Sequence, residues 1–275
     1  MFKKILLLAI LTLLTACVPP QSNGSSPSTI SVNNQNSGSI PLRIKRVGYL
    51  INVHAYPIHT HSGTTNLTNF EKRYHFNWRI PAYIQHRLQS EFNTLRNVKL
   101  VNLASYGISA NEVNGLLSYA NGRWRVKEGK QNAYTKLTSR LGLSTIVIVN
   151  ESEKQAINDC GLMGCKKFNA KGYGLFTRSF MNSDKFYSAT AFYVHIYSLK
   201  PIRSLDPKVA EINHSNKMTL VAISKNSQAQ PNKIGFSYPK NFKNWQEREF
   251  APFRLPLIKY IDNMSRKIVD VVRSN

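Results

Sequence analysis

The order of hydrophobic and polar residues predicts alternating strands and helices over the first half of the folded chain. Residues 47–56 (VGYLINVHAY) are rich in strand formers and predict a first strand, and the polar stretch HTHSGTTNLTN after it predicts a loop. Residues 80–96 carry apolar side chains at helical spacing, with Pro81 in the first turn, and predict a helix. Residues 98–103 predict a second strand.

Further helices and a buried strand are predicted before residue 150. Ser109 and Glu112 have the spacing of a capping box and predict the start of a helix. A helix is also predicted over residues 132–141, ending at Gly142. Residues 144–149 (STIVIV) form a short apolar run, which predicts a strand buried on both faces.

The second half of the chain predicts an antiparallel meander and a closing helix. Strands are expected over residues 172–180, 186–199 and 218–223, joined by short connections, and residues 226–247 predict a loop. Residues 256–273 have one apolar face and predict a helix. The predicted fold class is α/β (α+β): a single domain with a mixed sheet, helices packed on it, and an antiparallel meander in the second half.

The N-terminal residues have the pattern of an export signal. Lys3 and Lys4 precede a ten-residue apolar region, Ile5 to Leu14, which is too short to span a bilayer. Leu14-Thr15-Ala16-Cys17 resembles the lipobox of bacterial lipoproteins. That resemblance implies a signal peptide over residues 1–16, lipidation of Cys17, and stable anchoring by more than one acyl chain. A secretory peptide with a chance cysteine is the alternative.

The segment after Cys17 predicts a flexible tether. Residues 18–42 contain no charged residue and are rich in Ser, Asn, Pro and Gly, so that they cannot bury a core. A coil of this length spans about 25–30 Å on average. The lipoprotein resemblance implies the periplasmic face of the outer membrane, because Val18 stands where an Asp would retain the protein in the inner membrane. The chain then divides into a signal (1–16), a lipidated cysteine with tether (17–42) and a periplasmic domain (43–275).

The charge of the chain is unusual and its apolar content is ordinary. The 42% of hydrophobic residues excludes a wholly disordered chain. With 37 Lys and Arg against 14 Asp and Glu, the net charge is +23, and loss of Lys3 and Lys4 with the signal leaves +21 on the exported chain. This excess of positive charge predicts an acidic partner or surface.

Several strings in the domain resemble a known family of envelope domains. VGYLINV, NVKLVNL, LTSRLGLSTIVIV, AFYVHIYSLKPIRS and the helix from Leu255 onward are similar to periplasmic domains of the TolB amino-terminal type, and to those of the outer-membrane lipoproteins LpoB and CsgG. The loop after the first strand and an insertion over residues 150–170 depart from that pattern. The resemblance implies a domain without enzymatic activity that docks to cell-envelope machines.

Basic residues recur beside aromatic residues in three clusters. In an exported protein such clusters suit anionic phospholipid, lipopolysaccharide or peptidoglycan better than nucleic acid. A basic composition without any binding role is the alternative. The candidate binding residues are Arg123, Trp124, Arg125, Lys127, Lys166, Lys167, Lys240, Lys243 and Trp245.

Two cysteines remain after Cys17, and they lie in one short segment. Cys160 and Cys165 are separated by four residues, two of them glycines, and in an oxidising compartment they predict a disulfide. A redox pair is the alternative, although the spacing is not Cys-x-x-Cys. A metal site would need further ligands nearby.

We predict no catalytic residue, no metal site and no cofactor. His59 and His61 have the spacing of a metal pair, but solvated loop histidines are the expected reading. Ser237 and Lys240 match the Ser-x-x-Lys pattern, which keeps an envelope hydrolase as a third possibility, although its partner motifs are missing. The leading hypothesis is a non-catalytic docking subunit of an envelope machine in secretion, wall synthesis or lipid transport. The alternative is a direct binder of peptidoglycan or lipopolysaccharide.

Overall fold

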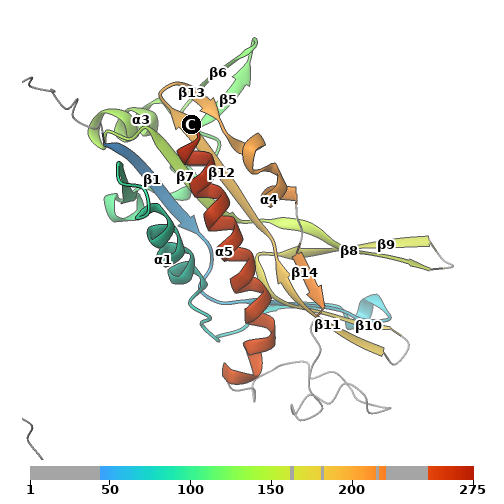
Figure 1. Ribbon diagram of the computed structural model, residues 1–275. Coiled ribbons are helices and arrows are strands. Elements are labelled where there is room, and N and C mark those ends of the chain that lie inside the picture. The colour runs from blue at the N-terminus through green and yellow to red at the C-terminus, as the bar shows by residue number, and fades with distance from the viewer. Residues whose placement is uncertain (1–43, 162–163, 181–182, 215–216, 221–246) are drawn as a thin grey trace, which may run out of the picture. The chain divides into compact units, whose positions relative to one another are not determined.

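Two five-stranded sheets make up most of the structure, which is a computed structural model (Figure 1). The described residues belong to one compact unit that starts at Leu42. The predicted signal, Cys17, the predicted tether and most of the predicted loop at 226–247 lie outside the described residues. The structure describes residues 44–161, 164–180, 183–214, 217–220 and 247–275.

The first sheet combines three parallel strands with two antiparallel ones. Its strands are β1 (Lys45–Asn52), β4 (Val98–Asn102), β7 (Thr145–Glu151), β12 (Phe192–Leu199) and β13 (Ile202–Ser204). In space their order is β13-β12-β7-β1-β4, with β1, β4 and β7 parallel to one another. Residues 145–150 of the central strand β7 are all buried, because helices or strands cover both faces of the sheet.

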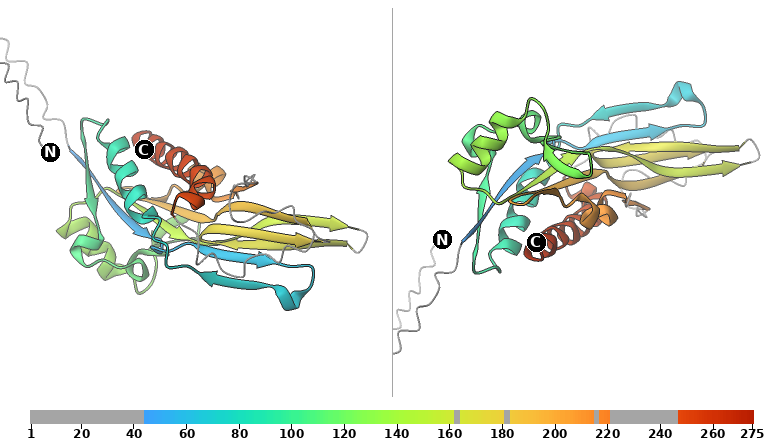
Figure 2. Two further views of the ribbon diagram at one scale, coloured as in Figure 1. Left: turned by 90° about the horizontal axis from the view of Figure 1, so that it is seen from below. Right: turned by 90° about the horizontal axis from the view of Figure 1, so that it is seen from above.

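Two long helices lie on one face of the first sheet (Figure 2). These are α1 (Ile80–Phe92) and α5 (Ala251–Arg273), and Arg87 of α1 bridges Asp262 of α5 at 2.8 Å. Leu257, Ile261, Met264 and Ile268 follow the helical repeat of α5 and are buried in the main core. Burial of each such side chain contributes about 1.5–3 kcal/mol relative to exposure.

Short elements cover the opposite face of the first sheet. They enclose a second core around Leu50, Ile146 and Ile148. The predicted capping box is present, since the Ser109 backbone N–H donates to the Glu112 carboxylate. These elements are α2 (Ala110–Val113), the hairpin β5 (Leu117–Ala120) and β6 (Arg123–Val126), α3 (Gln131–Thr135) and a π-helical segment, Lys136–Arg140.

The second sheet has the order β14-β11-β10-β2-β3. Gly174 permits the close pairing of β10 with β2, because a Cβ at this position would lie 2.1 Å from the Ile58 carbonyl oxygen. A separate hairpin, β8 (Glu153–Gly161) and β9 (Gly164–Lys171), extends beside this sheet (Figure 1). The strands of the sheet are β2 (Ile58–Ser62), β3 (Phe70–Arg73), β10 (Tyr173–Phe180), β11 (Ser183–Thr190) and β14 (Lys217–Leu220).

Three linker residues hydrogen-bond to one another where the first sheet, the β8–β9 hairpin and the second sheet meet: Ser152 joins β7 to β8, Gly172 joins β9 to β10, and Ala191 joins β11 to β12. Ser152 N–H donates to the Ala191 carbonyl, Ala191 N–H to Gly172, and Gly172 N–H to Ser152. Helix α5 also spans both sheets, since the Ser188 hydroxyl of β11 donates to the Phe253 carbonyl at 2.6 Å. The short elements that complete the fold are α4 (Ala210–His214) and the 3₁₀ turns Asn66–Thr68, Ala104–Tyr106, Asp206–Val209 and Glu247–Phe250.

The predicted fold class is confirmed: the domain is α+β, with a mixed sheet, helices packed on it, and antiparallel strand pairs in the second half. Two local predictions were wrong. The polar stretch after β1 contains the strand β2, and the predicted single strand 186–199 is two strands in different sheets, separated at Ala191. The hairpin β8–β9 was not predicted as strands.

Candidate functional site

The first predicted basic cluster lies on the hairpin β5–β6. Side chains alternate along a strand, and this alternation separates Trp124 from its basic neighbours. Trp124 packs against the second core, with its ring 5.3 Å from that of Tyr119 on the opposite strand. Arg123 and Arg125 are exposed on the other face of the hairpin, and Lys127 is exposed just after it. The cations are therefore available to a partner, whereas the tryptophan is mainly structural.

The strand order gathers further basic residues at the end of the first sheet where β1 begins. Residue 44 leads out of this end towards the predicted tether, and β13 at the same end contacts both strands of the β5–β6 hairpin (Figure 1). We call this region the tether-end surface. It comprises Lys45, Arg46, Arg96, Lys99, Arg140, Lys200, Arg203 and Arg273.

Two of these residues secure the end of α5 against the first sheet. The Lys45 ammonium donates to the Val272 carbonyl oxygen at 2.9 Å, where the negative end of the helix dipole favours a cation. The Arg203 guanidinium donates to the Asn275 side chain. Burial, and secondarily the charge of Arg203, lowers the pKa of Lys45. The contribution of Arg203 reflects the closeness of these two cations.

Acidic residues are scarce among the segments that form the tether-end surface. Segments 44–46, 93–99, 140–144, 199–203 and 270–275 contain one acid, Asp270, which pairs with Arg273 at 2.7 Å. Within the described residues, the cations without an ion-pair partner include Arg96, Lys99, Arg140 and Lys200, all of them exposed. The tether-end surface therefore presents uncompensated positive charge to solvent.

The second predicted cluster lies on β9. Lys167 is exposed, while Phe168 beside it turns inward and is buried. The side chain of Lys166 is outside the described residues. Lys171, further along β9, pairs with Glu71 of β3 at 3.3 Å. The third cluster, with Lys240, Lys243 and Trp245, lies outside the described residues altogether.

Lys167 also borders a hollow between β9 and the β2–β3 edge of the second sheet. The hollow has a volume of about 440 Å³. Its lining mixes aromatic, amide and charged side chains, among them Phe70, Asn169, Glu71 and Lys167. Such a lining is open and polar, and the basic residues of the tether-end surface do not contribute to it.

His59 and His61 are buried on β2 and are not solvated loop residues as predicted. His59 contacts the Tyr74 hydroxyl and the Thr177 hydroxyl, each at 2.9 Å, and His61 contacts the same Thr177 hydroxyl at 2.7 Å. Burial, with smaller effects of His61 and Lys72, lowers the pKa of His59 to about 3. Among the residues that the structure describes, no group of three His, Cys, Asp or Glu residues could hold a metal ion.

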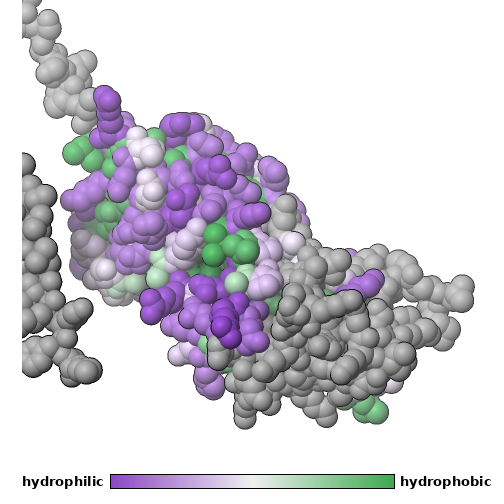
Figure 3. Space-filling model, turned by 60° about the horizontal axis from the view of Figure 1, so that its bottom comes forward, coloured by the Kyte–Doolittle hydropathy of each residue, from purple (hydrophilic) through white to green (hydrophobic). Residues whose placement is uncertain are grey.

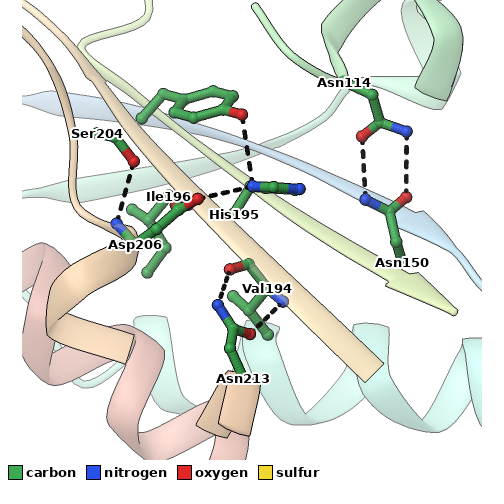
Figure 4. Close-up of polar contacts among 9 residues, drawn as sticks. Asn114, Asn150, Val194, His195, Ile196, Ser204, Asp206 and Asn213 are labelled. Carbon is green, nitrogen blue, oxygen red and sulfur yellow. Dashed lines mark hydrogen bonds and ion pairs between the residues drawn. The ribbon is translucent and has the colours of Figure 1, made fainter. Parts of the chain in front are cut away.

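A histidine–aspartate pair lies at the edge of the first sheet (Figure 4). The Asp206 carboxylate contacts His195 Nδ1 at 2.7 Å and accepts the Ile196 backbone N–H at 2.9 Å. The Tyr197 hydroxyl lies 3.4 Å from the same ring nitrogen, and burial raises the pKa of this phenol. The tyrosine is thus a poor nucleophile at neutral pH, and the pair serves to hold strand β12 to the turn that follows β13.

Asn213 closes the same strand edge a little further along. Its side-chain amide accepts the Val194 N–H at 2.7 Å and donates to the Val194 carbonyl at 2.8 Å, as a neighbouring strand would (Figure 4). On the next strand, Asn150 exchanges hydrogen bonds with Asn114, the residue directly after α2. These polar contacts complete the sheet and are consistent with a structural role.

Cys160 and Cys165 are directly opposite each other in the backbone register of the β8–β9 hairpin. Residues directly opposite each other on antiparallel strands have Cα atoms about 4.5–5.5 Å apart, which lies within the range that disulfides span. The positions of their side chains lie outside what the structure describes. A disulfide between them stays a prediction, supported by this register.

Comparison with protein-family models and with curated proteins finds no match to the chain. In the described part of the chain, no helix combines the length and the apolar character needed to cross a membrane.

Sequence reasoning found the cluster on the β5–β6 hairpin but missed the tether-end surface. Arg123, Arg125 and Lys127 are close in sequence, whereas Lys45, Lys99 and Lys200 come from distant segments. The only sequence signal for the latter is a basic residue at or near the end of each predicted strand. That signal becomes informative once the strand order is known.

Proposed function

We propose that the chain is a lipid-anchored protein of the bacterial cell envelope, held at the periplasmic face of the outer membrane. The observation that carries this proposal is the continuity from the lipobox at Cys17, through an uncharged tether, to the first strand of the domain at Lys45. Such a tether lets a folded domain reach on the order of 80 Å from its anchor at full extension.

We further propose that the domain is a non-catalytic docking subunit of an envelope machine in secretion, wall synthesis or lipid transport. Support comes from the exposed cations, which suit contact with an acidic partner, and from the described His195–Asp206 pair, whose contacts serve the sheet edge. The described surface in Figure 3 is mostly hydrophilic, with a small hydrophobic patch. Polar and electrostatic recognition is therefore the expected mode of docking.

The anchoring proposal is tested by mass spectrometry of the N-terminal peptide of protein made in its native envelope. We expect a chain that begins at Cys17 and carries a diacylglyceryl group on the thiol, and we expect Cys17→Ser to lose that group. An unmodified Cys17, or cleavage at another residue, would contradict the proposal.

The docking proposal is tested by crosslinking in intact cells, followed by identification of the proteins captured. We expect a defined envelope protein whose capture falls when Arg123, Arg125 and Lys127 are changed to Gln. A capture pattern that this change leaves intact would contradict a role for the hairpin cluster.

Direct binding of peptidoglycan or lipopolysaccharide is the second candidate function. The exposed cations of the β5–β6 hairpin and Lys167 favour it, because both polymers are anionic. Co-sedimentation with purified sacculi, and with lipopolysaccharide, at about 150 mM salt tests this candidate. Absence of retention in both assays would remove it.

A further inference from the structure

The tether-end surface is arranged so that an anchored domain would turn it towards its own membrane. Its cations belong to the ends of strands and helices at the end of the first sheet from which residue 44 leads to the predicted tether. The surface thus lies at the end of the domain where the first described strand begins. The following inference rests on the proposed lipid anchor.

The charge of this surface distinguishes it from the rest of the described domain. Its single acid, Asp270, is paired with Arg273, and Arg96, Lys99, Arg140 and Lys200 are exposed. On the second sheet and the β8–β9 hairpin, by contrast, Glu71 pairs with Lys171, and Glu153 is a further exposed acid. Positive charge is concentrated at the end of the first sheet where β1 begins.

The position and breadth of this surface favour a phospholipid bilayer over a compact ligand. The cations are spread over the ends of several elements, from the loop before β4 to the turn between β12 and β13, and line no described pocket. A broad array of exposed cations suits many headgroups at once, because each basic residue near an anionic leaflet adds a similar increment of binding energy. The tether itself carries no charge that would compete for the same lipids.

We propose that the tether-end surface docks the domain onto anionic phospholipid headgroups of the leaflet that holds the anchor. Docking orders the domain with the first sheet end-on to the membrane, and it leaves the second sheet and the β8–β9 hairpin on the side away from the bilayer. The lipid anchor raises the local concentration of the domain at the membrane, and the basic surface sets the orientation of the domain.

The test uses the mature chain without its lipid, residues 18–275, which contains every described residue. Its flotation with vesicles of phosphatidylcholine is compared with flotation on vesicles containing about one third phosphatidylglycerol, at about 150 mM salt. The test variant carries Arg96→Gln, Lys99→Gln, Arg140→Gln and Lys200→Gln. The matched control carries Lys167→Gln, Lys185→Gln, Lys208→Gln and Lys259→Gln, exposed residues away from the tether end.

We expect the unmodified chain to float with the anionic vesicles only, and the test variant to lose roughly tenfold or more in partitioning. Both variants lose the same amount of charge, but the control variant keeps all the cations of the tether-end surface. It should therefore keep most of its binding. Equal loss in both variants would overturn the proposal, since binding would then follow net charge. Absence of binding to anionic vesicles, or binding to sacculi alone, would also overturn it. Circular dichroism and thermal melting show whether each variant is folded.

This experiment is independent of the anchor itself. If Cys17 proves unmodified while the lipid-free chain binds anionic vesicles through the tether-end surface, the proposed anchoring fails and the lipid-binding surface stands. If Cys17 is lipidated and the lipid-free chain does not bind anionic vesicles, the proposed anchoring stands and the lipid-binding surface fails.

Discussion

The two sheets of the domain differ in where their ionisable side chains lie. The first sheet has an apolar interior and keeps its charges at its end and edge, as with Lys99, Lys200 and Asp206. The second sheet buries ionisable groups among its strands, as with His59 and His61 bonded to Thr177. Charges of the first sheet are thus available to a partner, whereas the histidines of the second sheet stabilise its own strand pairing. The predictions below separate these two uses.

The largest effect is expected from Gly174→Ala, which should break the second sheet and spare the first. The new Cβ would clash with the Ile58 backbone, and we expect a loss of about 4 kcal/mol or more of unfolding free energy. Urea denaturation measures the loss of unfolding free energy, and hydrogen exchange shows which strands lose protection. The amides of β2 and β10 should lose protection before those of β1 and β7.

Gly122→Ala is the matched control for this change. Gly122 also has a positive φ, of 74°, but a Cβ there meets nothing within 4 Å. Only backbone strain is added, at a cost of about 1–2 kcal/mol. Equal losses in the two variants would show that strain, and not the close approach of β10 to β2, explains the effect.

Mild acid should weaken the second sheet selectively. The pKa of His59 is lowered to about 3 in the folded protein, mainly by burial, and is about 6.5 in the unfolded chain. Below pH 6.5, His59 therefore binds a proton in the unfolded chain but not in the folded protein. The free energy of unfolding falls as the pH falls. We expect a loss of about 2 kcal/mol between pH 7 and pH 5 from this group.

His59→Leu tests the origin of that pH dependence. The variant should be less stable at pH 7, because it removes the contacts that His59 makes with the Tyr74 and Thr177 hydroxyls. Its stability should nevertheless change less between pH 7 and pH 5. An unchanged slope in urea denaturation would assign the pH dependence to another group.

Asn213→Ala should open the edge of the first sheet. The change leaves the Val194 N–H and carbonyl without their partners, at a cost of about 1–3 kcal/mol. The freed edge also favours pairing between chains. Thermal melting measures the loss of stability, and light scattering measures the pairing between chains. Asn93→Ala, at an exposed position after α1, is the control. Equal behaviour of the two variants would contradict the edge-closing role.

The smallest effect is expected from the exposed pair that Lys171 of the β8–β9 hairpin forms with Glu71 of the second sheet. Both side chains are close to half exposed, so their attraction is screened by solvent. A double-mutant cycle with Lys171→Ala and Glu71→Ala should give a coupling below about 0.5 kcal/mol. A coupling above 1 kcal/mol would mean that surface charges of the second sheet also hold it together.

The sequence predicted those elements whose patterns are local. The apolar run of β7 and the helical repeat of α5 each identify their element within a few residues, and the Ser109–Glu112 capping box lies within a single turn. Strand β2 was missed because its inward side chains are His59 and His61. Their burial is made possible by Thr177, which lies more than one hundred positions away.

For the candidate site, too, the sequence predicted only what depends on neighbouring residues. Arg123, Arg125 and Lys127 were found because they are neighbours in the sequence, but the alternation of β6 turns Trp124 away from them. The tether-end surface depends on which strand ends lie together, and the order β13-β12-β7-β1-β4 results from long-range packing. No local pattern encodes that order.

The place of β1 in the first sheet determines how the domain would bear mechanical load. A force applied at Lys45 along the axis of β1 would act on a strand that is hydrogen-bonded to β4 on one side and to β7 on the other. A force in that direction shears both ladders, so that their hydrogen bonds resist together. A strand pulled sideways from a sheet edge would instead lose its bonds one after another. A subunit held between a membrane and a moving partner would then be attached at a strand that is hydrogen-bonded on both sides.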